Sequence, residues 1–248
     1  MDLFGVLSRF WPNFLSGVGT TLMITAICIP VGAVFALPLA ILRDRGNRVL
    51  SAPIRLYVSF FRGTPALTQL FLIYYGSGDF RPTLQQVGFW WLFKEPLLCA
   101  LLAFTLNTIA YQVEIVRGGL QGVAGGEIEA GRAIGMGNIA LYRHVILPHA
   151  YRLALPALGN EVILLMKSSA IASVITIYDL MGETRRVYAR TFDFSAYFWA
   201  AVLYLALTTL FVRGWHRIER ASTRHQSAQP AVLPETILPM AFVRKMPR

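Results

Sequence analysis

Long apolar stretches, separated by short polar segments, account for most of this chain. The residues from Val18 to Leu42 include no charged side chain, and a helix of that length can cross the ~30 Å hydrocarbon core of a bilayer. A second apolar stretch of about 18–20 residues ends near Tyr75. Three more are Pro96–Val113, Leu153–Tyr178 and Phe194–Val212. This pattern predicts an all-α polytopic membrane protein with about five transmembrane helices.

The two ends of the chain differ from the apolar stretches. Residues 1–17 carry several aromatic side chains at amphipathic spacing, which suit the membrane interface. Residues 220–248 are basic and then rich in Ser, Gln and Pro, and they show no apolar period. We therefore expect a periplasmic amphipathic lead at 1–17, a transmembrane domain at 18–219 and a disordered cytoplasmic tail at 220–248.

One long amphipathic segment, from Gly126 to Pro148, interrupts the apolar pattern. Glu129 and neighbouring charges lie among small residues, and Gly135 then breaks the helical period. A second short period ends at Leu147-Pro148. The segment predicts a helix, a sharp turn and a second helix that stops at the proline. Glycines from Gly118 to Gly126 precede it, and we expect them to loosen the chain.

Composition supports a membrane protein and argues against several other classes. Of the 248 residues, 55% are hydrophobic and 15% are charged, and the mean hydropathy is +0.52; a soluble domain carries about 25% charged residues. Neither a phosphate-binding G-x-x-x-x-G-K-[ST] loop nor a G-x-S-x-G or H-E-x-x-H motif occurs. We therefore expect no enzyme activity and no cofactor bound by this chain. Cys28 and Cys99 lie in apolar stretches and indicate neither a disulfide nor a metal site.

The basic side chains indicate how the chain is oriented. The net charge is +10, and most Lys and Arg residues flank apolar stretches without forming a nucleic-acid-binding motif. Sixteen of the 23 lie in the first loop, the third loop and the C-terminal region. Cytoplasmic loops of membrane proteins carry an excess of Lys and Arg. This bias predicts a cytoplasmic C-terminus, a cytoplasmic 126–148 segment and an N-terminus outside.

The spacing of residues in the 126–148 segment matches a known motif. The matching residues are Glu129, Ala130, Gly131, Gly135, Val145, Leu147 and Pro148. The segment resembles the EAA loop of permease subunits in binding-protein-dependent ABC importers, although Gly131 and Val145 stand where that motif has Ala and Ile. The resemblance implies a type I ABC importer permease fold. It also implies that these residues, apart from Val145, couple the chain to an ATPase.

The resemblance extends over most of the chain, from about Gly17 to Glu219. Phe61–Pro65 (FRGTP), Ala110–Gly119 and Asn160–Ser169 are similar to the polar-amino-acid branch of these permeases. The chain looks most like the second permease subunit of histidine, arginine and ornithine importers and of opine (octopine, nopaline) importers. The resemblance implies a bacterial inner-membrane importer for polar, basic amino acids or opines. Its expected partners are a second permease of the same fold, a dimeric subunit that binds ATP, and a periplasmic solute-binding protein.

Two ionisable residues inside the fourth apolar stretch are candidates for the substrate pathway. Glu161 and Lys167 are six residues apart, so on a helix they point about 120° away from one another. An ionisable group at membrane depth costs a few kcal/mol and usually faces a cavity or a partner. Glu161 either attracts a cationic group, such as a guanidinium, or forms an interhelical salt bridge, for instance with Arg117 or with Lys167 of another subunit. Lys167 contacts a substrate carboxylate, gates the path, or extends toward the membrane interface.

Four further polar positions in the apolar stretches could line the path: Asn160, Asn107, Tyr111 and Gln69. Polar side chains also join membrane helices to one another, so both interpretations are open. A second functional hypothesis is a stand-alone secondary transporter or channel subunit that uses Glu161 and Lys167 as an ion relay. Many secondary transporters are built from inverted repeats, and the unequal apolar stretches show no such repeat.

Overall fold

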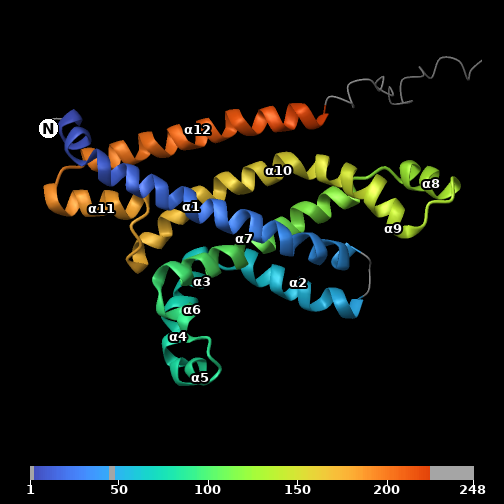
Figure 1. The fold of residues 1–248 in the computed structure, drawn as a ribbon, viewed down its shortest axis with the longest axis horizontal. Coiled ribbons are helices and arrows are strands. Elements are labelled where there is room, and N and C mark those ends of the chain that lie inside the picture. Colours follow the sequence, from blue (N-terminus) through green and yellow to red (C-terminus); the bar gives the residue numbers. More distant parts are fainter. Residues whose placement is uncertain (1–2, 45–47, 224–248) are drawn as a thin grey trace, which may run out of the picture.

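The computed structural model describes residues 3–44 and 48–223, and in this part of the chain every regular element is a helix (Figure 1). The predicted all-α fold is confirmed. Most of the tail predicted for 220–248 lies outside the described residues. The elements are α1 (Leu3–Asp44), α2 (Arg48–Gly63), α3 (Ala66–Tyr74), α4 (Gly76–Asp79), α5 (Arg81–Gln86), α6 (Trp90–Lys94), α7 (Pro96–Gln121), α8 (Gly125–Ala133), α9 (Asn138–Leu141), η1 (Tyr142–Ile146), α10 (Leu147–Ser168), η2 (Ser169–Ile175), α11 (Leu180–Thr191) and α12 (Ser195–Thr223).

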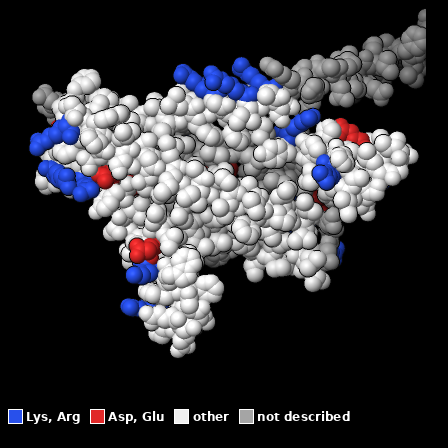
Figure 2. Space-filling view, in the orientation of Figure 1, with Lys and Arg blue, Asp and Glu red and all other residues white. Residues whose placement is uncertain are grey.

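Four helical stretches of the described residues are long and apolar enough to cross a membrane: Phe4–Asp44, Pro96–Gln121, Asn138–Ile175 and Ser195–Ser222. They correspond to the first, third, fourth and fifth apolar stretches of the sequence. On the face seen in Figure 2, basic side chains gather over the C-terminal half of α12 and at the two ends of the molecule, and the surface between them is largely uncharged. The polytopic class is therefore confirmed.

The second predicted span has a different form, because α2 and α3 take its place. α2 ends at Gly63, and α3 begins at Ala66 and is nine residues long. Pro65 between them has an extended backbone (φ −62°, ψ 137°). Proline has no N–H, so the carbonyl of Phe61 cannot make its usual helical hydrogen bond. The helix ends here, and the expectation of one continuous second span was wrong.

The amphipathic lead is part of the first long helix. α1 bends at Phe10, whose backbone is not helical (φ −113°, ψ 15°). Pro12 follows two residues later, and a proline inside a helix clashes with the carbonyl four residues before it. No helix therefore ends at residue 17. The amphipathic lead and the first span together form one bent helix, α1.

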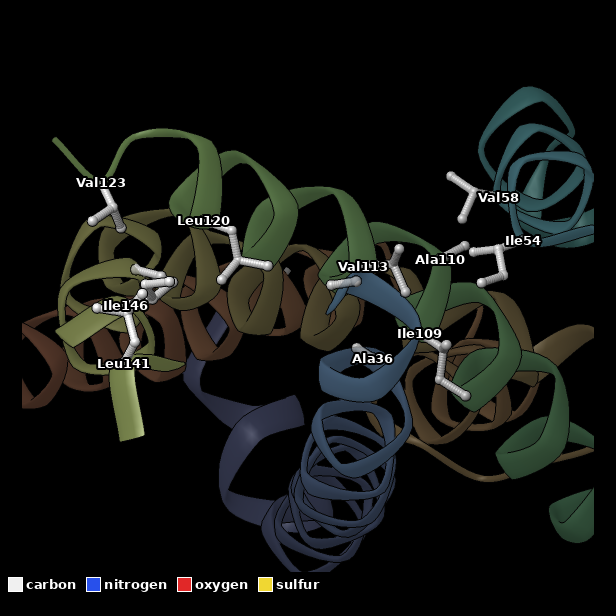
Figure 3. Close-up of a cluster of buried hydrophobic side chains, with 12 residues drawn as sticks. Ala36, Ile54, Val58, Ile109, Ala110, Val113, Leu120, Val123, Leu141 and Ile146 are labelled. Atoms are coloured by element: carbon white, nitrogen blue, oxygen red, sulfur yellow. The ribbon is translucent and has the colours of Figure 1, made fainter. Parts of the chain in front are cut away.

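α7 is the helix on which the others assemble. It packs against α1, α10, α2 and α3. A buried apolar cluster surrounds it, and Figure 3 shows that this cluster extends from Ile109 in the middle of α7 to Leu120 near its end. Leu141 and Ile146, from the 126–148 segment, belong to the same cluster. The segment is thus packed against the end of α7.

The N-terminal half of α1 is covered by α11 and α12 (Figure 1). Asp179 caps α11 by accepting a hydrogen bond from the N–H of Gly182 at 2.9 Å, and the N–H of Leu180 donates to Thr21 Oγ1 at 3.2 Å. A Cβ at Gly17 would lie 2.8 Å from the Cα of Leu180. The start of α11 is therefore in direct backbone contact with α1.

Two neighbouring glycines of α7 have different surroundings. A Cβ at Gly119 would lie 2.4 Å from the carbonyl oxygen of Ala150 in α10, whereas a Cβ at Gly118 would meet nothing within 4 Å. Both glycines are inside α7, which continues to Gln121, so the expectation that they loosen the chain was wrong. Gly119 instead allows the backbones of α7 and α10 to approach closely, as small residues do in membrane helix pairs.

The pair provides a matched test of this contact. Gly119→Ala should destabilise the protein by about 1–3 kcal/mol because the added methyl group forces α7 and α10 apart. Gly118→Ala should be neutral or stabilise the helix by up to about 1 kcal/mol. Thermal unfolding of the two variants in detergent measures the difference, and equal melting temperatures would contradict the close contact.

Candidate functional site

A pocket of about 250 Å³ lies between the middle of α7, the C-terminal part of α10 and the break between α2 and α3. It has both polar and apolar walls. The lining residues are Thr64, Pro65, Ala66, Phe104, Asn107, Tyr111, Glu161, Leu164, Leu165 and Ser168. Three of the six residues proposed for the pathway, Asn107, Tyr111 and Glu161, are therefore brought together here.

Glu161 is the acidic group of this pocket. Its side chain is 5% exposed, and its Oε1 accepts a hydrogen bond from Thr108 Oγ1 at 2.8 Å. No Lys or Arg of the described residues forms a salt bridge with it, and Arg117 is paired with Glu114 instead. A buried carboxylate with one neutral hydrogen bond is poorly compensated. It can therefore attract a cation that enters the pocket.

A short chain of hydrogen bonds orients the Thr108 hydroxyl. Gln112 Nε2 donates to Thr108 Oγ1 at 3.2 Å and to the carbonyl of Ile29 at 3.2 Å. Because Thr108 accepts from Gln112, its own proton is directed to Glu161. Sequence reasoning missed Thr108 and Gln112. Their i, i+4 spacing, parallel to that of Asn107 and Tyr111, was the available signal.

Gln69 supports the pocket from behind. It is 2% exposed, and its Nε2 donates to the carbonyls of Phe61 at 2.8 Å and Thr64 at 3.0 Å. Its Oε1 accepts from Asn107 Nδ2 at 2.8 Å. The carbonyl of Phe61, which Pro65 leaves without a helical donor, is satisfied in this way. Gln69 therefore holds the helix break and Asn107 in place and does not line the pocket.

Asn160 and Lys167 lie elsewhere on α10. Both side chains are exposed, whereas Glu161 is buried. Leu164, which is 48% exposed, is four residues after Asn160 and three before Lys167, so the three share one face of the helix. The structure thus separates the buried Glu161 from Asn160 and Lys167, which do not line the pocket, while the half-exposed Leu164 borders both the pocket and the outer stripe of Asn160, Leu164 and Lys167.

Charged side chains gather one turn beyond Tyr111. Glu114 forms salt bridges with Arg43 and, at 3.0 Å, with Arg117. The Arg62 guanidinium is 3.8 Å from Glu114 and lies over the ring of Tyr111, 5.4 Å from its centroid. This cluster connects the ends of α1, α2 and α7 beside the pocket.

The 126–148 segment forms the second candidate site and projects at one end of the molecule (Figure 1). α8 ends in a Schellman motif, in which Gly135 N–H donates to the Arg132 carbonyl at 2.9 Å and Met136 N–H to the Gly131 carbonyl at 3.1 Å. Gly135 has φ +83°, a conformation that glycine adopts without strain. The predicted helix and sharp turn are confirmed.

The predicted stop at Leu147-Pro148 was wrong, because both residues open α10. Proline is tolerated in the first turn of a helix, where its N–H would have no partner. Since Pro148 offers no N–H to the carbonyl of His144, the chain before it widens into the π-type turn η1. The segment therefore leads directly into the helix that carries Glu161.

The residues of the 126–148 segment divide between an inner and an outer face. Gly131 is buried, and a Cβ there would lie 2.6 Å from Leu141 Cδ1, so the smaller residue at this position suits the packing. Glu129 and Ala130 are exposed. Ile134 is 75% exposed and Ile139 85% exposed. Two isoleucines at the surface beside Ala130 are typical of a docking face.

Comparison with known proteins identifies relatives over most of the chain. Residues 29–225 match the model of the family described as binding-protein-dependent transport system inner membrane component. The chain is 43% identical over 214 residues to the nopaline transport system permease protein NocM of Agrobacterium fabrum, covering 86% of this chain and 88% of that protein. It is 38% identical over 228 residues to the histidine/lysine/arginine/ornithine transport system permease protein HisM of Escherichia coli K12, covering 89% and 96%.

A solved structure shows the same fold. A chain in the crystal structure of an amino acid ABC transporter with histidines superposes with a TM-score of 0.78 and 33% sequence identity. The match covers 89% of this chain and 99% of that chain. The described residues include the bend in the first helix, the break in the second span and the projecting 126–148 segment.

Proposed function

The chain belongs to the family of binding-protein-dependent transport system inner membrane components, and from this premise we propose that it transports basic amino acids or opines through the Glu161 pocket. It is a permease subunit of an ABC importer and not an enzyme, as its relatives are transport permeases. The observation that carries the proposal is the buried Glu161 carboxylate, which faces a pocket and has no cationic partner among the described residues.

The relatives support this class of substrate. HisM is named for histidine, lysine, arginine and ornithine, and each of these has a basic side chain that a carboxylate can bind. NocM is named for nopaline. The rival hypothesis of a stand-alone secondary transporter or channel is not favoured, because these relatives are permeases of binding-protein-dependent systems.

Two exposed faces of the chain would each contact one partner protein. The stripe of Asn160, Leu164 and Lys167 on α10 would face a second permease of the same fold, so Lys167 would lie between the two subunits. The face of Glu129, Ala130, Ile134 and Ile139 would dock on a dimeric ATP-binding subunit, which would bind ATP in place of this chain. A periplasmic solute-binding protein would deliver the substrate. No nucleic acid is involved in this proposal.

Mechanical coupling would pass through α7. ATP-driven closure of the partner would move the 126–148 segment, in which Leu141 of α9 and Ile146 of η1 share an apolar cluster with Leu120 of α7. α7 also carries Asn107 and Tyr111, which line the pocket. Displacement of the docking face would therefore tilt α7 and α10 together, as a rigid body, between an inward-facing and an outward-facing state.

Substitutions in the 126–148 segment test the docking face. Ala130→Trp places a bulky ring on the exposed docking face, and Gly135→Pro removes the N–H that closes the Schellman motif. Each should reduce substrate-stimulated ATP hydrolysis by at least about tenfold, because the coupling step is lost while the spans remain folded. Gln121→Trp, an exposed position at the end of α7, is the control. Normal stimulation in Ala130→Trp would exclude this face as the docking site.

Thiol labelling tests the orientation in a bacterial inner membrane. After Cys28 and Cys99 are replaced by Ala, a cysteine at Gln121 should be protected from a membrane-impermeant thiol reagent in intact cells. Cysteines at Asp79 and Asp193 should be labelled, because the loops that contain them carry few basic residues and should lie outside. Labelling at Gln121 from outside would reverse the proposed topology, with its external N-terminus and cytoplasmic C-terminus.

Removal of the charge of Glu161 tests the proposed cation site. Glu161→Gln keeps the shape of the side chain and removes its charge, so binding of arginine to the purified permease–ATPase complex should weaken by about ten- to a hundredfold. Binding of citrulline, the neutral analogue, should change much less. Radioligand binding in nanodiscs measures both affinities.

Glu183→Gln is the matched control, because Glu183 is equally buried but hydrogen-bonds Asn13 in another part of the bundle. It should leave the arginine affinity unchanged. Equal loss of arginine and citrulline in Glu161→Gln, together with a lower melting temperature, would show that Glu161 holds the fold and does not select cations.

A further inference from the structure

A cationic side chain, that of Arg62, lies against one of the residues that line the pocket. Arg62 ends α2, two residues before Thr64, which lines the pocket. Its guanidinium covers the ring of Tyr111, another lining residue. Asn107, Tyr111 and Glu114 are spaced i, i+4 and i+7 on α7 and so share one face. Arg62, held between Tyr111 and Glu114, therefore marks the end of the pocket that is nearer the C-terminus of α7.

The charge of Arg62 is not neutralised. Three arginines surround the single carboxylate of Glu114, and Arg43 and Arg117 approach it more closely than Arg62, whose distance is 3.8 Å. Arg62 also has the most exposed side chain of the three, at 44%. Within the described part of the chain, its guanidinium contacts are the long ion pair and the Tyr111 ring. Its N–H donors are thus available to a ligand.

Glu161 and Arg62 are connected through the lining of one pocket. Arg62 covers the ring of Tyr111, and Tyr111 and Glu161 line the same pocket, yet no salt bridge joins Arg62 to Glu161. A ligand between them that carries a cation at one end and an anion at the other would satisfy both. A guanidinium fork binds a carboxylate through two parallel hydrogen bonds, and every free amino acid has an α-carboxylate.

We infer that Arg62 binds the carboxylate of the amino-acid substrate, while Glu161 receives its cationic side chain. The inference rests on the proposed function and adds a second recognition point to the same pocket. Glu114 acts as a positioning residue, because its long ion pair holds Arg62 beside Tyr111 without consuming its hydrogen-bond donors. The pocket would therefore select a molecule by two charges and by the distance between them.

A comparison of arginine with agmatine tests the inference. Agmatine has the same guanidinium and lacks the carboxylate. In the purified permease–ATPase complex, wild type should bind arginine about ten- to a hundredfold more tightly than agmatine. Arg62→Gln should lose this preference by weakening arginine alone. Arg62→Lys, which keeps a charge without the planar fork, should retain part of the preference.

Arg55→Gln is the control, since Arg55 lies two turns earlier on the same helix and its guanidinium bonds Ser51. It should keep the wild-type preference. If Arg62→Gln weakens the binding of arginine and agmatine equally, Arg62 only holds α2 against α7, and the inference is overturned. Equal affinity of wild type for arginine and agmatine would also overturn it.

Glu161→Gln separates this inference from the proposed function. It should weaken arginine and agmatine alike, because both carry the guanidinium. If it changes neither affinity while Arg62→Gln abolishes the preference, the carboxylate contact stands and the cation site does not. If wild type binds neither ligand, the pocket is not a substrate site and both proposals fall.

Discussion

A carboxylate buried among apolar helices is the constraint on which the rest of this structure depends. Removing Glu161 from water costs several kcal/mol, and the hydrogen bond from Thr108 offsets only part of that cost. The low dielectric that makes the carboxylate unfavourable also strengthens its attraction for an entering cation. The burial of Glu161 therefore both lowers the stability of the fold and would strengthen the binding of a cation. The chain Ile29–Gln112–Thr108 fixes the carboxylate at the point where α1, α7 and α10 meet.

A site of this kind is useful for transport only if its walls can move as units. α7 contributes Asn107 and Tyr111 to the pocket and Leu120 to the cluster that holds the projecting segment. The close backbone contact at Gly119 joins it to α10, which carries Glu161. Packed interiors resist gradual deformation and change between discrete arrangements. Both walls of the pocket are thus attached to the projecting 126–148 segment.

Hydropathy and the spacing around Glu129 predicted most of the fold, because each depends on local sequence alone. The break at Pro65 was missed, since a window average treats a proline among apolar residues as part of a span. The helical angle between Glu161 and Lys167 correctly predicted that they diverge. It could not reveal that Glu161 faces α7, because that depends on which helices become neighbours. The spacing of Thr108 and Gln112 could mark a polar helix face, but the contact of Thr108 with Glu161 could not be predicted for the same reason.

The helix break also decides which polar groups the pocket offers. The carbonyl of Phe61, left without a helical donor by Pro65, accepts from both Gln69 and Asn107. Asn107 Nδ2 also donates to Gln69, so both amide protons of Asn107 are committed behind the pocket. Its oxygen remains as an acceptor on the α7 wall, and the Glu161 carboxylate is an acceptor on the α10 wall. The two walls therefore favour donors and cations, and the guanidinium of Arg62 lies over the ring of Tyr111, another lining residue. The proposed selectivity for a ligand with two opposite charges would thus depend on a single proline, Pro65, which ends α2.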